Sequence, residues 1–332
     1  MTESALAGRA VAITGGAGFI GSHLTEQVLE AGASSVTVID DLSTGSASNL
    51  AACGTAARLV EGDVLQADKL ACLAEADLVF HLAVKNVRHS IKEPASNFRV
   101  NADGTLEILE ALRRAGGKAR FVYVSSSEVY GIPPSGCYSE DVLPAPTTVY
   151  GAGKLAGELV TQAYQRTYGM DTRVVRPFNS FGPRSHFEGD SGEVIPKFIL
   201  RALAARPLQV HGEGSQTRDF TYVEDTARWL VQLSMPDRLT GEVVNVSSGR
   251  ETRIADLAAM IVDLTGSSSP VVHVAPRPGD LPRLLADTAK VRRFVDFRLG
   301  VGLEEGLKRT IDYFARHDAD ALLAQEVERN WT

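Results

Sequence analysis

Residues 10–21 read AVAITGGAGFIG, a short apolar run with β-branched residues that leads directly into a glycine-rich turn. Glycines three residues apart, at Gly15, Gly18 and Gly21, permit a sharp turn, a close approach of the backbone to a phosphate group, and tight packing of a following helix. The amino terminus of that helix would present N–H donors to an anion. Glycine spacing alone can also mark a plain turn. In this context it predicts a strand, a phosphate-binding turn and a helix.

The carboxylate of Asp40 strengthens this interpretation. Asp40 ends the next predicted strand, about 25 residues after Gly15, where a side chain can accept hydrogen bonds from the ribose hydroxyls of adenosine. Because Asp41 and not an arginine follows, a 2′-phosphate on that ribose would be repelled, so the pattern favours NAD over NADP. Asp63, after the third predicted strand, either accepts from the adenine amino group or lies in a solvated turn.

Short β-branched runs alternate with helical segments through the first 180 residues. Parallel strands joined by crossover helices give a sheet covered on both faces. We therefore predict an α/β fold, with a Rossmann-type doubly wound parallel sheet in residues 1–178 and a smaller mixed α/β substrate domain in residues 179–332, from which some segments return to the first domain. The expected strands of the first part are Ala10 to Thr14, Val36 to Ile39, Leu59 to Glu61, Leu78 to Leu82, Phe121 to Ser125 and Thr172 to Arg176. In the second part we expect helices at Val194 to Ala205, Val223 to Leu233, Ile254 to Leu264 and Leu303 to Phe314, and short strands at Leu208 to Val210, Val243 to Val246 and Val271 to Val274.

The composition argues against several classes of protein. The 332 residues carry a net charge of −7 without a run of basic residues, which disfavours a nucleic-acid partner or an anionic membrane surface. No segment reaches the ~18 to 20 consecutive apolar residues of a membrane span. Cys53, Cys72 and Cys137 are odd in number and lack the spacing of a disulfide framework or a zinc site. We expect a cytoplasmic protein without a metal site.

Candidate catalytic residues follow the fifth predicted strand, at the edge of the sheet where such folds bind ligands. Ser126 comes directly after that strand and could hold a substrate hydroxyl in line, while Tyr150 and Lys154 stand one helical turn apart on a shared face. A nearby ammonium and the positive nicotinamide ring would both lower the pKa of Tyr150 toward the range of a general base. A Tyr and a Lys at this spacing can also be exposed surface residues without a function, but the upstream glycine turn and serine favour a catalytic role.

Taken together, these motifs resemble the NAD-dependent epimerase/dehydratase family, the extended short-chain dehydrogenases that act on nucleotide sugars. The resemblance extends over nearly the whole chain. It implies that Ser126, Tyr150 and Lys154 form the catalytic trio and that Lys154 also holds the nicotinamide ribose. The matching stretches are Thr14 to Gly21, Asp40 to Gly45, His81 to Ala83, Asn101 to Thr105, Ser125 to Gly131, Tyr150 to Lys154, Arg176 to Asn179, Gly182 to Arg184, Gln216 to Val223 and Arg277 to Asp280.

The resemblance also implies which residues bind each ligand. Asn179, Arg218 and Arg277 match positions that contact the diphosphate or nucleoside of a sugar nucleotide, and arginine forks suit a doubly charged diphosphate. The expected NAD-binding residues are Gly15, Gly18, Phe19, Ile20, Gly21, Asp40, Asp41, Ser43, Thr44, Asp63, Val64, Leu82, Ala83, Lys85, Asn101, Tyr150, Lys154 and Pro177. The expected substrate-binding residues are Lys85, Arg88, Ser126, Ser127, Glu128, Tyr150, Asn179, Arg184, Val194, Arg218, Arg277 and Asp280.

The shared first step in such enzymes is oxidation at sugar C4, in which Tyr150 would remove the hydroxyl proton while NAD takes the hydride. The ketone can then be reduced from its opposite face to a 4-epimer, lose water to a 4-keto-6-deoxy sugar, or lose a C5 carboxylate to a pentose. Residues 126–128 read Ser-Ser-Glu, without the acid that dTDP-glucose 4,6-dehydratases carry in the middle of this triplet. The leading serine is more typical of epimerases, so we expect a nucleotide-sugar 4-epimerase. Glu128 keeps 4,6-dehydration and UDP-glucuronate decarboxylation open, and a catalytically silent NAD-binding regulator is the alternative from another class.

Three further features allow two interpretations each. Glu128 is either a catalytic group or a structural carboxylate, and residues 186–190 form either a sugar-selecting lid or a solvated loop. His81, at a strand end, is expected to be a structural histidine rather than a base. The stretch from His81 to Ser90 is one residue shorter than the usual family pattern, with Lys85 and Arg88 facing the expected hexose.

The helical segments Ala95 to Arg114 and Thr148 to Tyr168 carry apolar residues on more than one face. A helix of this kind needs more than one packing partner. We therefore expect a homodimer built on a four-helix interface, the alternative being helices buried within a monomer. The residues concerned are Phe98, Val100, Leu106 and Ile108 in the first segment and Leu155, Leu159, Val160 and Tyr164 in the second.

Overall fold

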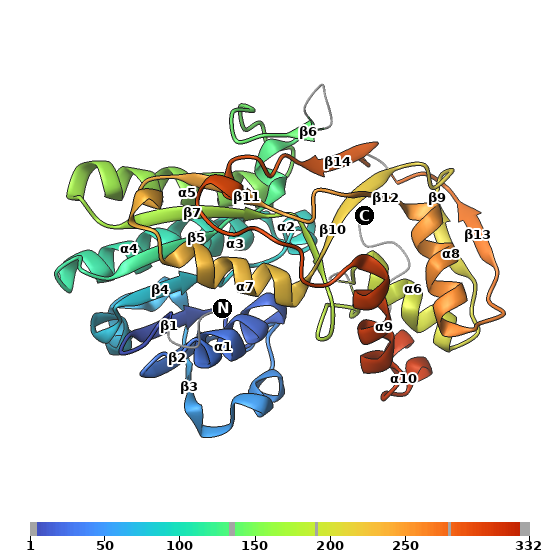
Figure 1. The fold of residues 1–332 in the computed structure, drawn as a ribbon, viewed down its shortest axis with the longest axis horizontal. Coiled ribbons are helices and arrows are strands. Elements are labelled where there is room, and N and C mark those ends of the chain that lie inside the picture. Colours follow the sequence, from blue (N-terminus) through green and yellow to red (C-terminus); the bar gives the residue numbers. More distant parts are fainter. Residues whose placement is uncertain (1–4, 133–136, 190–191, 278–279, 326–332) are drawn as a thin grey trace.

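The computed structural model describes residues 5–132, 137–189, 192–277 and 280–325. Its centre is a seven-stranded parallel sheet with the order β11-β7-β5-β4-β1-β2-β3 (Figure 1). From β1 the chain moves outward to β2 and β3 and then crosses to β4, β5 and β7 on the other side, which confirms the predicted doubly wound fold. The strands are β1 (Ala10–Thr14), β2 (Ser35–Asp40), β3 (Ala57–Glu61), β4 (Leu78–His81), β5 (Arg120–Val124), β7 (Thr172–Pro177) and β11 (Val243–Val246).

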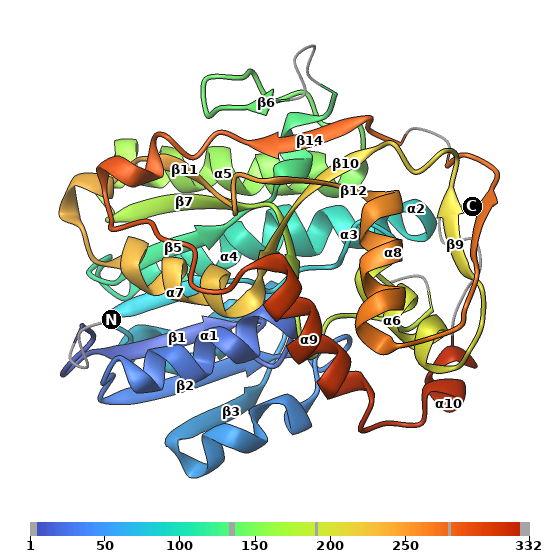
Figure 2. The same ribbon diagram turned by 45° about the vertical axis from the view of Figure 1, so that its right-hand side comes forward.

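Helices cover both faces of this sheet because its strands are apolar on both sides (Figures 1 and 2). Val11 and Ile13 of β1 belong to the core under α1 (Phe19–Glu30) and α7 (Val223–Ser234). Ala12, between them, belongs to the opposite core under α4 (Gly104–Arg114) and α5 (Val149–Tyr168). Alternate side chains of one strand therefore anchor both layers, as expected for a buried parallel sheet. The chain reaches α4 through α2 (His89–Lys92), α3 (Pro94–Phe98) and a π-helical turn at Arg99–Asp103.

A second lobe lies beside the sheet and has its own apolar core. Its strands form a sheet of order β12-β10-β14-β6, with β8 paired to β10, and a separate pair of β13 and β9. The strands are β6 (Cys137–Tyr138), β8 (Asn179–Phe181), β9 (Leu208–His211), β10 (Thr217–Tyr222), β12 (Glu251–Arg253), β13 (Val271–Val274) and β14 (Arg283–Ala286). The helices are α6 (Val194–Leu203), α8 (Ile254–Thr265), α9 (Leu303–Phe314) and α10 (Ala319–Leu323).

Two segments beyond residue 178 rejoin the first sheet. β11 pairs with β7, and α7 packs against α1 on the same layer. The predicted strands and helices are present with ends that differ by no more than two residues. β10 was not predicted, because the run Thr-Arg-Asp-Phe-Thr-Tyr mixes charged and aromatic residues and has no apolar alternation.

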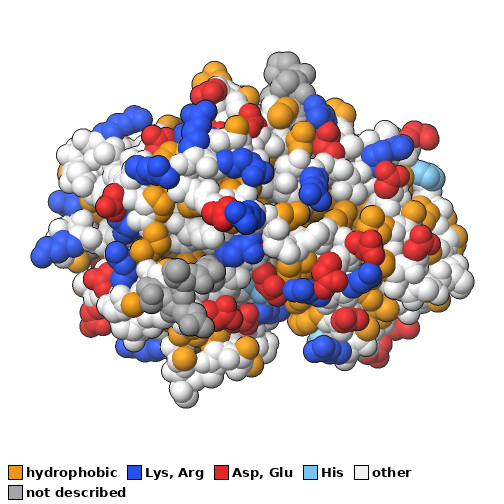
Figure 3. Space-filling view, in the orientation of Figure 1, with side chains coloured by type: hydrophobic (Ala, Val, Ile, Leu, Met, Phe, Trp, Pro, Cys, Tyr) orange, Lys and Arg blue, Asp and Glu red, His pale blue; other side chains and the backbone are white. Residues whose placement is uncertain are grey.

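On the face shown in Figure 3, basic and acidic side chains intermingle over both lobes. That face therefore offers no extended positive surface of the kind that binds nucleic acid. Within the described ranges, no helix combines the length and the apolar character that crossing a membrane requires.

Candidate active site

A cavity of about 800 Å³ opens between the carboxyl ends of the sheet strands and the second lobe. Ligands of doubly wound proteins bind at this edge. Of the residues expected at the site, the cavity is lined by Gly15, Gly18, Phe19, Ile20, Gly21, Asp40, Asp41, Thr44, Asp63, Val64, Leu82, Ala83, Lys85, Arg88, Ser126, Ser127, Glu128, Tyr150, Lys154, Pro177, Asn179, Val194, Arg218, Arg277 and Asp280. Ser43, Asn101 and Arg184 are not among the lining residues.

The glycine turn joins β1 to α1 as the sequence pattern requires. Gly15 has a φ of +70°, and a Cβ on it would lie 2.6 Å from the Ala83 nitrogen. A Cβ on Gly21 would lie 2.8 Å from the Gly16 Cα, so Gly21 lets α1 start directly against the turn. A Cβ on Gly18 would meet only the Gly15 oxygen, at 3.2 Å, and Gly18 lines the cavity. The three glycines thus provide the turn, the exposed backbone and the close packing of a pyrophosphate-binding loop.

Two carboxylates lie at the end of β2 on the cavity wall, Asp40 as its last residue and Asp41 directly after it. Asp40 is 7% exposed and accepts hydrogen bonds from the backbone N–H groups of Ala17 and Leu42, both at 2.9 Å. Burial raises its pKa above the usual aspartate value. Although burial opposes it, hydrogen bonds from Ser43 and Lys85 hold the pKa of Asp41 below that value. Both residues line the cavity, and the prediction that they exclude a 2′-phosphate on the adenosine ribose stands on this placement.

Ser43 and Asn101 are not among the lining residues but hydrogen-bond residues that are, and their expected contacts with the cofactor stay predictions. The Ser43 hydroxyl donates to the Asp41 carboxylate at 2.6 Å. The Lys85 ammonium donates to the same carboxylate at 3.1 Å and also contacts the Ser43 hydroxyl. Asn101 is 1% exposed; its side-chain oxygen accepts from the Lys85 N–H and its amide donates to the Lys85 carbonyl, both at 3.0 Å. Both residues therefore fix groups that line the cavity.

Asp63 and Val64 line the end of the cavity near β3. The Asp63 carboxylate accepts from the Leu65 N–H at 2.9 Å and caps the short 3₁₀ helix Val64–Lys69. Asp63 therefore lies in a turn and also lines the cavity, and its contact with the adenine amino group stays a prediction.

Tyr150, Ser126 and Lys154 lie together in the cavity. Thr148 caps α5, its hydroxyl accepting from the Gly151 N–H at 3.0 Å, and this fixes the first turn that carries Tyr150. The Ser126 hydroxyl lies close enough to the Tyr150 phenol to lower its pKa. Lys154 is 3% exposed; its ammonium donates to the Val124 carbonyl at 2.6 Å and lies 4.4 Å from the Tyr123 ring centre.

In the chain by itself Lys154 is not among the groups that shift the pKa of Tyr150, and the lowering expected from the nicotinamide ring stays a prediction. Burial raises the pKa of Tyr150 to about 12, and the Ser126 hydroxyl only partly offsets this shift. Burial also lowers the pKa of Lys154 to about 7, so near neutral pH its charge is incomplete. The physical reason is that desolvation disfavours both charged forms, while the ammonium is directed to the Val124 carbonyl. Forming the phenolate therefore requires a further positive charge.

Arginines dominate the wall farther from the glycine turn. The Arg218 guanidinium donates to the carbonyls of Thr217 and Leu281, at 2.7 and 2.8 Å, and pairs with the Asp280 carboxylate. Burial lowers the pKa of Arg277 to about 10, and the neighbouring charges of Arg88 and Arg218 add to this effect. Three guanidiniums that repel one another in a partly buried site favour the binding of an anion. Pro278 and Gly279 of the motif that contains Arg277 lie outside the described residues.

The Glu128 carboxyl faces the same wall. Burial raises its pKa, although the charges of Arg88 and Arg218 oppose the shift. The N–H of Glu128 donates to the Ser126 hydroxyl at 3.2 Å, which positions the serine side chain beside Tyr150. Asn179 and Val194 line the cavity from β8 and the start of α6.

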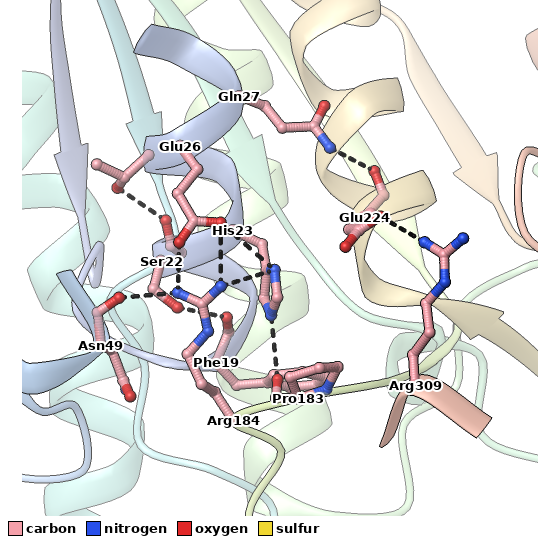
Figure 4. Close-up of polar contacts among 12 residues, drawn as sticks. Phe19, Ser22, His23, Glu26, Gln27, Asn49, Pro183, Arg184, Glu224 and Arg309 are labelled. Atoms are coloured by element: carbon pink, nitrogen blue, oxygen red, sulfur yellow. Dashed lines mark hydrogen bonds and ion pairs between the residues drawn. The ribbon is translucent and has the colours of Figure 1, made fainter. Parts of the chain in front are cut away.

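Arg184 is not among the residues that line the cavity, so its expected contact with substrate finds no support in the geometry of the chain. The residue has a φ of +67°, and its guanidinium pairs with Glu26 on α1, outside the cavity wall (Figure 4). A family motif that ends in an arginine therefore carries no information about the direction of its side chain.

His81 is a structural histidine, as expected, because both of its ring nitrogens are hydrogen bonded. It is 1% exposed and lies between the hydroxyls of Thr14, at 2.6 Å, and Thr105, at 3.1 Å. Burial lowers its pKa to about 3. In the stretch from 186 to 190, His186 lines the cavity and pairs with Glu188 at 3.6 Å, and Asp190 lies outside the described residues.

Glu193 is a lining residue that the sequence did not single out. Burial raises its pKa to about 7, and its charge raises the pKa of Tyr150. It stands in the irregular stretch before α6, where no periodicity or motif marks it. Only the folding of this stretch against the cavity reveals that a second carboxyl group faces the site.

Comparisons with known proteins agree with this geometry. Residues 11–247 match the NAD dependent epimerase/dehydratase family. The chain is 35% identical over 307 residues to a UDP-glucose 4-epimerase from Mycolicibacterium smegmatis, covering 91% of this chain and 97% of that protein. It is 35% identical over 314 residues to a UDP-glucuronic acid decarboxylase 1 from Xenopus tropicalis, covering 92% and 72%. A dTDP-glucose 4,6-dehydratase from Streptomyces venezuelae, solved with NAD bound, superimposes with a TM-score of 0.85 at 32% identity, covering 92% of this chain and 97% of that one. The chain therefore belongs to the NAD-dependent epimerase/dehydratase family, and its cofactor is NAD.

Proposed function

We propose that this protein is a nucleotide-sugar 4-epimerase that works through a transient 4-keto sugar. The observation that carries the proposal is the position of the Tyr150 and Ser126 side chains. They lie in one continuous cavity, with the glycine turn and Asp40 on one side and Arg218 and other arginines on the other. A sugar whose diphosphate met the arginines would present its ring to Tyr150.

In the proposed first step, Tyr150 accepts the proton of the C4 hydroxyl while Ser126 holds that hydroxyl. When bound, NAD supplies the acceptor for the C4 hydride and a positively charged ring that favours the tyrosine phenolate. The pKa of Tyr150 is about 12 in the chain alone, and the positive charge of the ring would lower it. Return of the hydride to the opposite face of the ketone gives the 4-epimer.

The choice of epimerisation rests on the residue between Ser126 and Glu128. Ser127 lines the cavity and provides no carboxyl group for expelling the 6-hydroxyl. The relative from Mycolicibacterium smegmatis is named a UDP-glucose 4-epimerase, which is the kind of activity proposed for this protein.

The second candidate function is 4,6-dehydration, and one observation favours it. Glu128 and Glu193 both line the cavity, and burial raises the pKa of each. One carboxylate could remove the C5 proton while the other, still protonated, donated to the departing hydroxyl. Decarboxylation, the activity named for the Xenopus tropicalis relative, needs a hexuronate substrate instead.

A substrate panel tests the proposal. UDP- and dTDP-linked glucose, galactose, N-acetylglucosamine and glucuronate are incubated with the protein, and products are separated and weighed by mass spectrometry. An isomer of unchanged mass supports the epimerase; loss of water or of carbon dioxide would replace it by the dehydratase or the decarboxylase. Tyr150→Phe should lower turnover by about 10²-fold or more while retaining NAD. Absence of product from every sugar would favour a catalytically silent regulator.

We further propose a homodimer formed through α3, α4 and α5. Phe98, Leu106 and Leu159 are 39%, 39% and 58% exposed, which leaves apolar surface on these helices. Ile108 and Tyr164, which were also expected to contribute, pack in the core under the sheet instead. Light scattering at micromolar concentration should report about twice 35.6 kDa, and a strictly monomeric mass would contradict this assembly.

A cytoplasmic location is also proposed. Cys53, Cys72 and Cys137 form no disulfide bond, and cysteines without disulfides are typical of proteins kept in a reducing compartment.

A further inference from the structure

Arg184 holds a strained position that needs an explanation once it is excluded from the cavity. Its φ of +67° lies in the left-handed region, which costs energy for a residue with a side chain. Such strain persists only where the surroundings impose it. The guanidinium of Arg184 contacts three residues at once, Glu26 and His23 on α1 and Asn49 in the 3₁₀ helix Ala47–Ala56, and these contacts hold the backbone in place (Figure 4).

The contacts are specific to a guanidinium. Its Nη1 donates to Glu26 Oε1 at 2.9 Å and to the Asn49 carbonyl at 2.8 Å. Its Nη2 donates to Glu26 Oε2 and to His23 Nδ1, both at 3.0 Å. This is a two-pronged ion pair with two additional acceptors, which a lysine ammonium does not reproduce.

The same contacts fix the protonation of His23. Because a guanidinium only donates, His23 Nδ1 must accept, so the ring proton lies on Nε2 and is donated to the Pro183 carbonyl at 3.0 Å. The histidine is 3% exposed, and burial together with Arg184 lowers its pKa to about 4. The ring is therefore neutral at pH 7 and bridges α1 to the residue before Arg184.

These contacts connect the two walls of the cavity. His23 and Glu26 lie in the first two turns of α1, whose first residue, Phe19, lines the cofactor side of the cavity and packs edge-on against the His23 ring at 6.2 Å. The segment that begins with Arg184 supplies His186 and Glu193 to the opposite side.

We propose that Arg184 is a positioning residue that couples NAD binding at the start of α1 to nucleotide-sugar binding beside His186 and Glu193, which line the cavity. This inference rests on the proposed function, since it needs a nucleotide sugar as the second ligand. A ligand that orders one wall orders the other through Arg184, so the second ligand loses less conformational freedom when it binds. Because such coupling is reciprocal, a bound nucleoside diphosphate should also retard the release of NAD.

The test measures exchange of radiolabelled NAD into the purified holoprotein, with and without UDP or dTDP at saturation. In the wild type the nucleoside diphosphate should slow exchange by about 5- to 150-fold, the usual range of coupling between two sites. In Arg184→Met the slowing should fall below about twofold, and Arg184→Lys, which retains the charge without the fork, should recover only part of it.

Arg184→Met leaves the Glu26 carboxylate without its cation, and this change alone could disturb folding. The double variant Arg184→Met/Glu26→Gln removes that charge as well, and circular dichroism checks that it folds. Arg309→Met is the matched control, because Arg309 makes a 3.5 Å pair with Glu224 in the same region, with both side chains about half exposed (Figure 4).

Loss of the slowing in the folded Arg184 variants, with Arg309→Met unaffected, supports the inference. Wild-type slowing in those variants overturns it. Calorimetry on the wild type separates the remaining outcomes. Binding of UDP or dTDP without any slowing overturns the coupling alone, whereas absence of binding by both overturns the proposed nucleotide-sugar substrate together with the coupling.

Discussion

Replacing Gly21 by alanine should weaken NAD binding by about 10- to 100-fold. A Cβ at Gly21 would lie 2.8 Å from the Gly16 Cα and closer still to the Gly15 carbonyl oxygen. Carbon atoms pack at about 3.5 Å or more, so α1 must move away from the turn by at least about 0.7 Å. Backbone lies on both sides of the contact, and Leu24 and Val28 anchor α1 in the core with 0% exposure, so the shift cannot be absorbed by a side chain.

The displacement acts on the phosphate site at the start of α1. An N–H donor that moves by about 0.7 Å from an optimal distance of about 2.9 Å exceeds hydrogen-bond range. One lost bond to a charged group is worth about 1.5 to 3 kcal/mol, which corresponds to the stated weakening. Overpacking should also cost about 1 to 3 kcal/mol of stability.

Equilibrium dialysis with NAD measures the affinity, and circular dichroism confirms that the variant is folded. Gly302→Ala is the matched control, because a Cβ there meets nothing within 4 Å and its φ is −71°. Wild-type affinity in the folded Gly21→Ala protein, or an equal loss in the control, would refute the reasoning.

Three more expectations follow from the site. The protein should bind NAD at least about 10-fold more tightly than NADP, because Asp40 and Asp41 line the cavity and are expected to face the adenosine ribose. Equal affinities measured by calorimetry would contradict that role. In deuterated water an epimerase should return product without deuterium at C5, and Glu128→Gln should cost only about 1.5 to 3 kcal/mol of stability or binding. Two other results would favour 4,6-dehydration: deuterium at C5 with loss of the 6-hydroxyl, and a rate loss of about 10²- to 10⁴-fold in the variant. His81, with a pKa lowered to about 3 by burial and by Lys154, stays neutral in the folded protein while it is protonated in the unfolded chain below its ordinary pKa of 6.5. Stability should therefore fall as the pH drops from 7 to 5, by about 2 kcal/mol through this residue, and urea unfolding of His81→Asn should show a correspondingly smaller pH dependence; identical dependence in both proteins would rule out the assignment.

The amino-acid sequence by itself determined the features that depend on a few adjacent residues. Gly15, Gly18 and Gly21 could be interpreted without a structure because the need for a missing Cβ is a local property of the backbone. Tyr150 and Lys154 could be paired because four residues span one helical turn. The alternation of apolar runs with helical segments predicted the parallel sheet because this pattern, too, is visible in short stretches of the sequence.

Tertiary structure alone decided the properties that depend on distant neighbours. Arg184 follows a recognisable motif, yet its left-handed backbone and the carboxylate of Glu26, far away in the sequence, direct its side chain to α1. Glu193 carries no local signal and becomes a cavity residue only through folding. The pKa values of Tyr150 and Lys154 shift against the expectation from their spacing because burial, which removes water from both, is set by the surrounding segments and outweighs their mutual charge.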